Sequence, residues 1–170
     1  MDNCGKKCSN FTTLKRNFLN YPIGEYQCKL DAKGRLMIPA DFQEQLGSLA
    51  EQGFVLRPGL FSKCIELYTM NDWVETQGKL KGLSQFVKTN VDLMRKYNAG
   101  AKLVKLDSSG RMLIPRNLIV EGGIQKEVVI NSLPGYMEIW DKDAYRSKLS
   151  DLDQDDLEKL LEEKLGVNNK

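Results

Sequence analysis

The sequence LDAKGRLMIP at residues 30–39 returns as LDSSGRMLIP at residues 106–115, so the pattern LDxxGRxxIP occurs twice, 76 residues apart. A similar strand pattern that ends in an aromatic residue follows each copy. Self-similarity at a fixed separation is typical of a duplicated structural unit. The sequence therefore predicts two related halves that organise the whole chain.

The first copy predicts a strand, a polar turn, a second strand and a short helix. Residues 27–30 alternate as in a strand, and the Asp-x-x-Gly that follows is typical of a tight turn in which Gly34 adopts a positive φ. Residues 36–38 resume an apolar strand. Pro39 cannot donate to a sheet ladder, so a helix is expected to open after it, near residues 40–46. The second copy predicts the same elements at residues 102–106, 112–114 and 116–120, with Gly110 in its turn and Pro115 before its helix.

Each turn carries an Asp and an Arg four residues apart, namely Asp31 with Arg35 and Asp107 with Arg111. The two side chains flank a chain reversal, so we expect a charge-assisted hydrogen bond that holds the guanidinium in place. An alternative is that the pair only stabilises the turn, although surface ion pairs of that kind contribute little. Two such turns in one chain, each with a protruding cation, favour a binding role.

Further strands are expected at residues 54–56 and 64–68 in the first half, and at 128–130 and 137–140 in the second. A helix follows each half, with caps expected at Asn71 or Asp72 and at Asp141. Another helix is predicted by apolar residues at helical spacing. We expect this apolar face mainly to pack in the core, with a partner-binding face as the alternative; its residues are Leu83, Phe86, Val87, Val91 and Met94.

The last twenty residues are acidic and predict an amphipathic helix. Aspartates at its beginning suit the positive end of the helix dipole. We expect this helix to pack on the body or on a neighbouring subunit, with a flexible acidic tail as the alternative. Its apolar positions are Leu152, Leu157, Leu160, Leu161 and Leu165.

The chain has 170 residues, of which 41% are hydrophobic and 28% charged, as in an ordinary globular protein. Its net charge of +2 conceals an uneven distribution. Residues 151–170 contain seven acidic and three basic residues, which leaves 22 basic and 16 acidic residues in residues 1–150. A basic body suits a polyanionic partner, because phosphate neutralisation by Lys and Arg drives nucleic-acid binding.

Composition argues against several classes of protein. No apolar segment approaches about 18 residues and no signal peptide is recognisable, so a cytoplasmic protein without a membrane partner is expected. The four cysteines are scattered and are expected to remain thiols; they are Cys4, Cys8, Cys28 and Cys64. Cys4 and Cys8 could form half of a metal site, but the chain has no histidine and no second such pair, so neither a metal nor a cofactor is predicted.

The absence of histidine also excludes Ser/His and Cys/His nucleophilic sites. The chain has no HExxH, Walker or GxGxxG motif. Asp31 and Asp107 lie beside arginines in exposed turns, which favours the ionised carboxylate and not a general acid. We therefore expect no catalytic residue, no small-molecule substrate and no enzymatic activity.

The two motifs, the helices between them and the closing EIWDKDAY segment resemble the MraZ family of bacterial transcriptional regulators, whose halves are each AbrB-like, over residues 22–148. The resemblance implies an α+β, β-rich fold with flanking helices: a double-ψ or swapped-hairpin β-barrel in which the two halves interleave as a pseudo-dimer. The implied divisions are an N-terminal extension (1–21), a first AbrB-like repeat (24–71), a helical connector (72–98), a second repeat (99–143) and a C-terminal helical tail (144–170).

The same resemblance implies sequence-specific binding to double-stranded DNA through the DxxxR motifs, by subunits that close into a homo-oligomeric ring. It also implies control of the division and cell-wall gene cluster, including the chain's own promoter, and association with the nucleoid. Tandem promoter repeats are the natural target, because a ring would bind them with avidity. The expected DNA-binding residues are Asp31, Lys33, Arg35, Asp107, Ser109 and Arg111, with Lys29, Lys102 and Lys105 on phosphates.

Within this scheme Arg35 and Arg111 are expected to reach base edges, most simply guanine. The second turn has Ser108 and Ser109 where the first has Ala32 and Lys33, so it is expected to contribute less affinity. The N-terminal bases could form a DNA arm or, as we favour, a disordered lead; they are Lys6, Lys7, Lys15 and Arg16.

A competing interpretation is an AbrB-like protein-interaction or antitoxin-type module. Two complete halves in one chain count against an antitoxin, which typically has one half and a toxin-binding tail. The acidic C-terminal helix keeps this alternative open.

Overall fold

The computed structural model describes residues 22–166. Expectations for Cys4, Cys8 and the N-terminal bases fall outside these residues. The described part contains eight strands and seven helices: β1 (Glu25–Lys29), β2 (Arg35–Met37), α2 (Ala40–Leu46), α3 (Leu49–Gln52), β3 (Phe54–Pro58), β4 (Ile65–Thr69), α4 (Met70–Lys81), α5 (Lys88–Asn98), β5 (Lys102–Val104), β6 (Arg111–Leu113), α6 (Arg116–Glu121), β7 (Glu127–Leu133), β8 (Tyr136–Asp141), α7 (Lys142–Ser150) and α8 (Gln154–Leu165).

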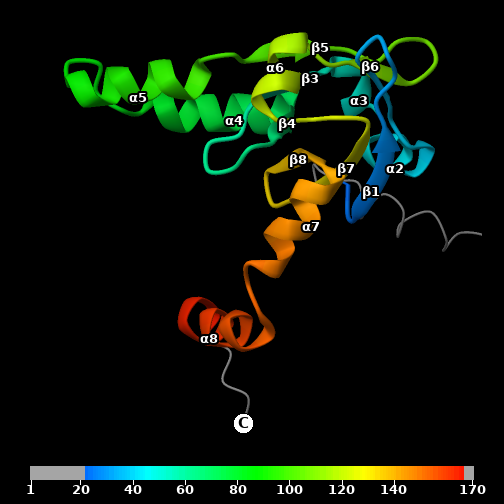
Figure 1. Ribbon diagram of the computed structural model, residues 1–170. Coiled ribbons are helices and arrows are strands. Elements are labelled where there is room, and N and C mark those ends of the chain that lie inside the picture. The colour runs from blue at the N-terminus through cyan, green and yellow to red at the C-terminus, as the bar shows by residue number, and fades with distance from the viewer. Residues whose placement is uncertain (1–21, 167–170) are drawn as a thin grey trace, which may run out of the picture.

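The strands form two antiparallel sheets beside seven helices, so the expected α+β class is confirmed. The expectation of a β-rich chain is wrong, because the helices of the described part contain more residues than its strands. The larger sheet has the order β1-β7-β8-β4-β3-β5, and the smaller sheet pairs β2 with β6. Strand β1 of the first half pairs with β7 of the second, and β5 of the second half pairs with β3 of the first. Each half therefore donates a strand to the other, and the two halves interleave (Figure 1).

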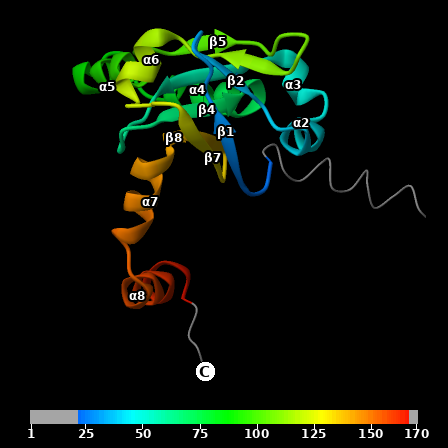
Figure 2. The same ribbon diagram turned by 45° about the vertical axis from the view of Figure 1, so that its right-hand side comes forward.

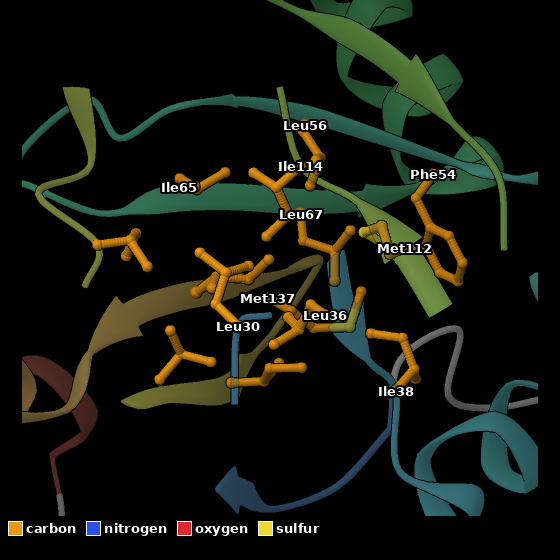
Figure 3. Close-up of a cluster of buried hydrophobic side chains, with 14 of the residues drawn as sticks. Leu30, Leu36, Ile38, Phe54, Leu56, Ile65, Leu67, Met112, Ile114 and Met137 are labelled. Carbon is orange, nitrogen blue, oxygen red and sulfur yellow. The ribbon is translucent and has the colours of Figure 1, made fainter. Parts of the chain in front are cut away.

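A single antiparallel bridge flanks each turn, Leu30 with Leu36 after β1 and Leu106 with Met112 after β5. Leu36 and Met112 lie opposite each other in the β2–β6 pair, and both side chains are fully buried. They point into an apolar cluster that also contains leucines and isoleucines of the larger sheet (Figure 3). Residues of both halves therefore share one core, as burial of apolar surface requires of two small units.

Helix α4 begins earlier than the sequence predicts. Thr69 caps it: its hydroxyl accepts a hydrogen bond from the Asp72 amide at 3.2 Å. The expected caps Asn71 and Asp72 therefore lie inside the helix, because the extended backbone of Thr69 already supplies the capping oxygen. The other expected cap is confirmed, since the Asp141 carboxylate accepts hydrogen bonds from the amides of Asp143 and Ala144.

The apolar stripe between the halves is not one helix. Residues 83–87 are not helical and contain bends and a turn, and α5 begins only at Lys88. Phe86 is fully exposed, Val87 is 46% exposed, and none of the five residues of the expected apolar face is buried, so the expectation that this face packs in the core is wrong. Helix α5 instead contacts the sheet through Tyr97, whose ring lies 4.1 Å from the guanidinium carbon of Arg57.

The acidic C-terminal segment forms α8, with Asp153 as its cap. No residue of α8 is buried. Helix α7 leads away from the sheets, and α8 lies beyond its far end in both views (Figures 1 and 2). Packing of α8 on the body of its own chain is therefore wrong, whereas packing on a neighbouring subunit stays a prediction.

Two kinds of feature are absent from the part of the chain that the structure describes. None of its helices is long and apolar enough to cross a membrane. Residues 22–166 contain no group of three or more His, Cys, Asp or Glu side chains placed to hold a metal ion.

Candidate nucleic-acid interface

The first turn is organised by one carboxylate. Oδ1 of Asp31 accepts hydrogen bonds from the backbone amides of Lys33, at 2.8 Å, and Arg35, at 2.9 Å. The turn is closed by a bond from the Gly34 amide to the Asp31 carbonyl at 3.0 Å. Gly34 has φ of 79°, which explains why glycine occupies this position.

The other carboxylate oxygen holds the arginine. Nε of Arg35 donates to Oδ2 of Asp31 at 2.7 Å, so the ion pair expected from the sequence is confirmed. The hydrogen bond from the Arg35 amide, with further help from its guanidinium, holds the pKa of Asp31 below its usual value. Among the described residues, neither Nη atom of Arg35 makes a hydrogen bond, so the outer edge of the fork keeps its donors for a ligand.

The second turn repeats this geometry. Oδ1 of Asp107 accepts from the amides of Ser109, at 2.9 Å, and Arg111, at 3.0 Å, and Oδ2 accepts from Nε of Arg111 at 2.8 Å. Gly110 has φ of 73°. The pKa of Asp107 is lowered chiefly by the hydrogen bond from the Arg111 amide. Both arginines are therefore held by the same set of contacts.

Each turn accepts a hydrogen bond from the residue directly after the strand that follows the other turn. The amide of Ile38 donates to the Gly110 carbonyl at 3.1 Å, and the amide of Ile114 donates to the Gly34 carbonyl at 2.9 Å. Together with the β2–β6 pairing, these bonds hold the two turns at a defined separation. Each turn is therefore held in part by residues of the other half.

The sequence interpretation missed two residues that lie close to the turn glycines and limit the space for a side chain there. A Cβ on Gly34 would lie 3.2 Å from Cδ1 of Ile119, and a Cβ on Gly110 would lie 2.6 Å from Nε2 of Gln43. Gln43 also donates to the Ile38 carbonyl at 2.8 Å. Both residues stand four positions after the motif proline, and this equivalence is the signal that could have revealed them.

The β2–β6 ribbon sets the relative positions of the arginines. Arg35 is opposite Leu113, and Arg111 is opposite Met37, on either side of the central pair. Because alternate residues of a strand face opposite sides, these four side chains share the face of the ribbon that looks away from the core. Met37 and Leu113 are 50% and 57% exposed there.

The expected phosphate-binding residues differ in position. Lys33 lies within the first turn, while Lys29 and Lys105 each precede a turn by two residues. Lys29 also lies 3.6 Å from a carboxylate oxygen of Glu127, which partly neutralises it. Lys102 begins β5 and is separated from Asp107 by five residues, a distance of about 16 Å along an extended chain.

A further cation was missed. Arg116, the first residue of α6, is exposed and lines the same hollow as Asp31 and Lys33. The equivalent position after the first motif is Ala40. The surroundings of the first turn are therefore more basic than those of the second.

Comparison with known proteins places these features in a family context. A family model described as "MraZ protein, putative antitoxin-like" matches residues 23–96 and 98–168. A protein named Transcriptional regulator MraZ from Christiangramia forsetii is 44% identical over 144 residues, which are 85% of this chain and 92% of that relative. Relatives of the same name from Flavobacterium psychrophilum and Cytophaga hutchinsonii are 40% and 33% identical, over 89% and 86% of this chain and 96% of each relative.

Proposed function

Because this chain belongs to the MraZ family, we propose that it is a DNA-binding transcriptional regulator that contacts duplex DNA through its two Asp–Arg turns. The carrying observation is that Asp31 and Asp107 bind the Nε of their arginines, which leaves the Nη edges of Arg35 and Arg111 on one face. A guanidinium held in this way loses little entropy on binding. Such a role is regulatory and not enzymatic.

The two arginines contact base edges, and the bidentate match of guanidinium to guanine N7 and O6 makes guanine the simplest partner. Lys33 contributes a cation to phosphate, and Ser109 contributes a hydroxyl at the equivalent position of the second turn. Lys29 and Lys105 approach phosphates beside their turns, and Lys102 does so from the start of β5.

The fold proposed for this surface is the swapped-hairpin, double-ψ type of barrel built as a pseudo-dimer. Support comes from the exchange of β1 and β5 between the halves. Further support comes from the bridges Leu30–Leu36 and Leu106–Met112, because they tie the segments that follow the edge strands β1 and β5 to the β2–β6 pair. The divisions at 24–71 and 99–143 delimit the two repeats in this proposal, with 72–98 as connector and 144–170 as tail.

The proposal includes a homo-oligomeric ring that binds tandem promoter repeats in the division and cell-wall gene cluster, including the chain's own promoter. The protein then resides in the cytoplasm and associates with the nucleoid. The half-exposed apolar side chains of α5 and α8 support an assembly, because apolar helix faces are normally covered. Several copies on one ring bind repeated sites more tightly than one copy binds one site.

The test is an anisotropy titration of DNA from upstream of the chain's own gene, with shuffled DNA as competitor. The Arg35→Ala, Arg111→Ala double variant is compared with Arg95→Ala, which removes an exposed arginine of α5 that pairs with Asp92. We expect specific, salt-sensitive binding that the double variant loses and the control keeps. Equal binding by parent and double variant would remove the two turns from the interface.

A second candidate is a protein-interaction or antitoxin-type module. It is favoured by one observation, the acidic and exposed α8 at the far end of α7. Deletion of residues 151–170 separates the two candidates. Unchanged DNA binding with loss of a co-purifying protein partner supports the module, whereas unchanged DNA binding with the same co-purifying proteins removes that support.

A further inference from the structure

We propose that Met37 and Leu113 are specificity-determining residues that contact thymine methyl groups in the major groove, each beside a guanine contacted by the arginine opposite it. This inference rests on the proposed function, since it needs the β2–β6 ribbon to face duplex DNA. It adds apolar base contacts to a surface otherwise described only by its charges.

The placement of the two residues carries the proposal. Both strands of the ribbon bury their central residue completely, Leu36 in β2 and Met112 in β6 (Figure 3). The flanking Met37 and Leu113 face the other way and expose half or more of their surface. Neither belongs to the buried core: Met37 lines a surface hollow beside Cys28 and Val128, and Leu113 lines the hollow beside the first turn, so each keeps an apolar surface open to a ligand.

The register places each apolar side chain against an arginine. Leu113 is opposite Arg35, and Met37 is opposite Arg111. Residues directly opposite in an antiparallel pair have Cβ atoms about 4.5–5.5 Å apart. Stacked base pairs are spaced about 3.4 Å apart. An arginine and the apolar residue opposite it can therefore reach the same or adjacent base pairs.

Groove chemistry identifies the occupant. The major groove admits a two-stranded β-ribbon, guanine offers N7 and O6 to a guanidinium, and thymine offers a methyl group to an apolar side chain. The two arginines, with Lys33 in the adjoining turn, make this face complementary to a polyanion. Each arginine and the apolar side chain opposite it therefore match a guanine beside a thymine. The register repeats this arrangement on both sides of the Leu36–Met112 pair, which lies on a pseudo-twofold axis.

The test removes only the methyl groups. The parent is titrated with the DNA upstream of its gene and with the same duplex in which deoxyuridine replaces thymidine. The parent should bind the deoxyuridine duplex roughly fourfold more weakly for each methyl group that it contacts, the equivalent of about 0.8 kcal/mol per buried CH₂. The Met37→Ala, Leu113→Ala double variant should bind the two duplexes nearly equally.

Two controls separate recognition from general effects. Val74→Ala shortens an exposed apolar residue of α4 and should keep the parent's preference for thymidine. Met37→Leu retains an apolar side chain and should also keep it, while thermal melting of every variant checks the fold.

The outcomes are distinguishable from failure of the proposed function. An equal preference for thymidine in the parent and the double alanine variant, or no preference in a parent that binds its promoter specifically, overturns the role of Met37 and Leu113 alone. If the parent does not distinguish promoter from shuffled DNA, both proposals fall.

Discussion

The two Asp–Arg turns have the same internal geometry and different surroundings. Their equivalent hydrogen bonds differ by 0.1 Å, because Asp, Gly and Arg recur at the same three positions. The positions between them differ, so the first turn has Lys33 where the second has Ser109. Arg116 adds charge only beside the first. The shared residues therefore determine shape, and the variable residues determine charge.

The largest effect should come from the pair that both turns share. Leu36→Ala and Met112→Ala each remove a fully buried side chain from the centre of the ribbon, so each should lower the free energy of unfolding by about 2–5 kcal/mol. The losses should be similar, since both residues belong to one core. Urea denaturation measures them; Met37→Ala is the exposed control, and a large loss there would contradict the burial pattern.

The arginines should show the next largest effect. Arg35→Ala and Arg111→Ala should each weaken promoter binding by about 1–3 kcal/mol, the usual contribution of a bidentate base contact. If the turns bind DNA as proposed, the loss should be greater for Arg35, because Lys33 and Arg116 place further cations beside its turn. Anisotropy titrations measure both, with Arg95→Ala as control. A greater loss for Arg111 would reverse the assigned order of the turns.

Alanine substitutions of the two turn glycines should lower the free energy of unfolding by different amounts, because the two glycines have different neighbours. Alanine at either position carries the positive-φ cost of about 1–2 kcal/mol in unfolding free energy. Gly110→Ala should cost more than Gly34→Ala, because its Cβ would displace Gln43 from the Ile38 carbonyl. Thermal or urea unfolding checks the difference. When both glycine variants also carry Gln43→Ala, their losses of unfolding free energy should become equal. If Gly110→Ala still costs more than Gly34→Ala, Gln43 is not the cause of the difference.

Exchange of the variable residues should have a smaller effect. Lys33→Ser should reduce the slope of log affinity against log salt by about 0.9, and Ser109→Lys should increase it by a similar amount, as expected for one phosphate contact. The variant with both changes should regain the parent's slope. An unchanged slope in both single variants would show that neither position contacts phosphate.

The stability that the two turn carboxylates contribute should depend on pH in the same way, and it should fall only at low pH. The pKa values of Asp31 and Asp107 are lowered by bonds to their arginines, so the stability that these carboxylates contribute is complete above the unfolded value of about 3.9. It is lost as pH falls through the lower folded values. Urea unfolding of the parent and of Asp31→Asn and Asp107→Asn should differ by a constant amount above about pH 5 and converge below it. If the difference in unfolding free energy between the parent and these variants changed between about pH 6 and 8, the lowered pKa values of the two aspartates would be contradicted.

Local patterns predicted the parts of the fold and site that depend on neighbouring residues. The Asp–Arg ion pairs, the positive φ of Gly34 and Gly110 and the Asp141 cap all arise within five residues of sequence. The prediction of a helix from Leu83 onward also rested on a local pattern, and it was wrong. Helical spacing of apolar residues does not show whether a non-helical segment interrupts them, and residues 83–87 are not helical.

The sequence by itself therefore determined the repeat, the shape of each turn and the contrast in charge between them, because these follow from residue type and short-range spacing. Only the tertiary structure decided that Ile119 and Gln43 support the opposite turn, that Met37 and Leu113 face outward beside the arginines, and that α8 lies away from the body. These features depend on register and on strands exchanged between the halves. Contacts between residues far apart in the chain leave no local pattern in the sequence.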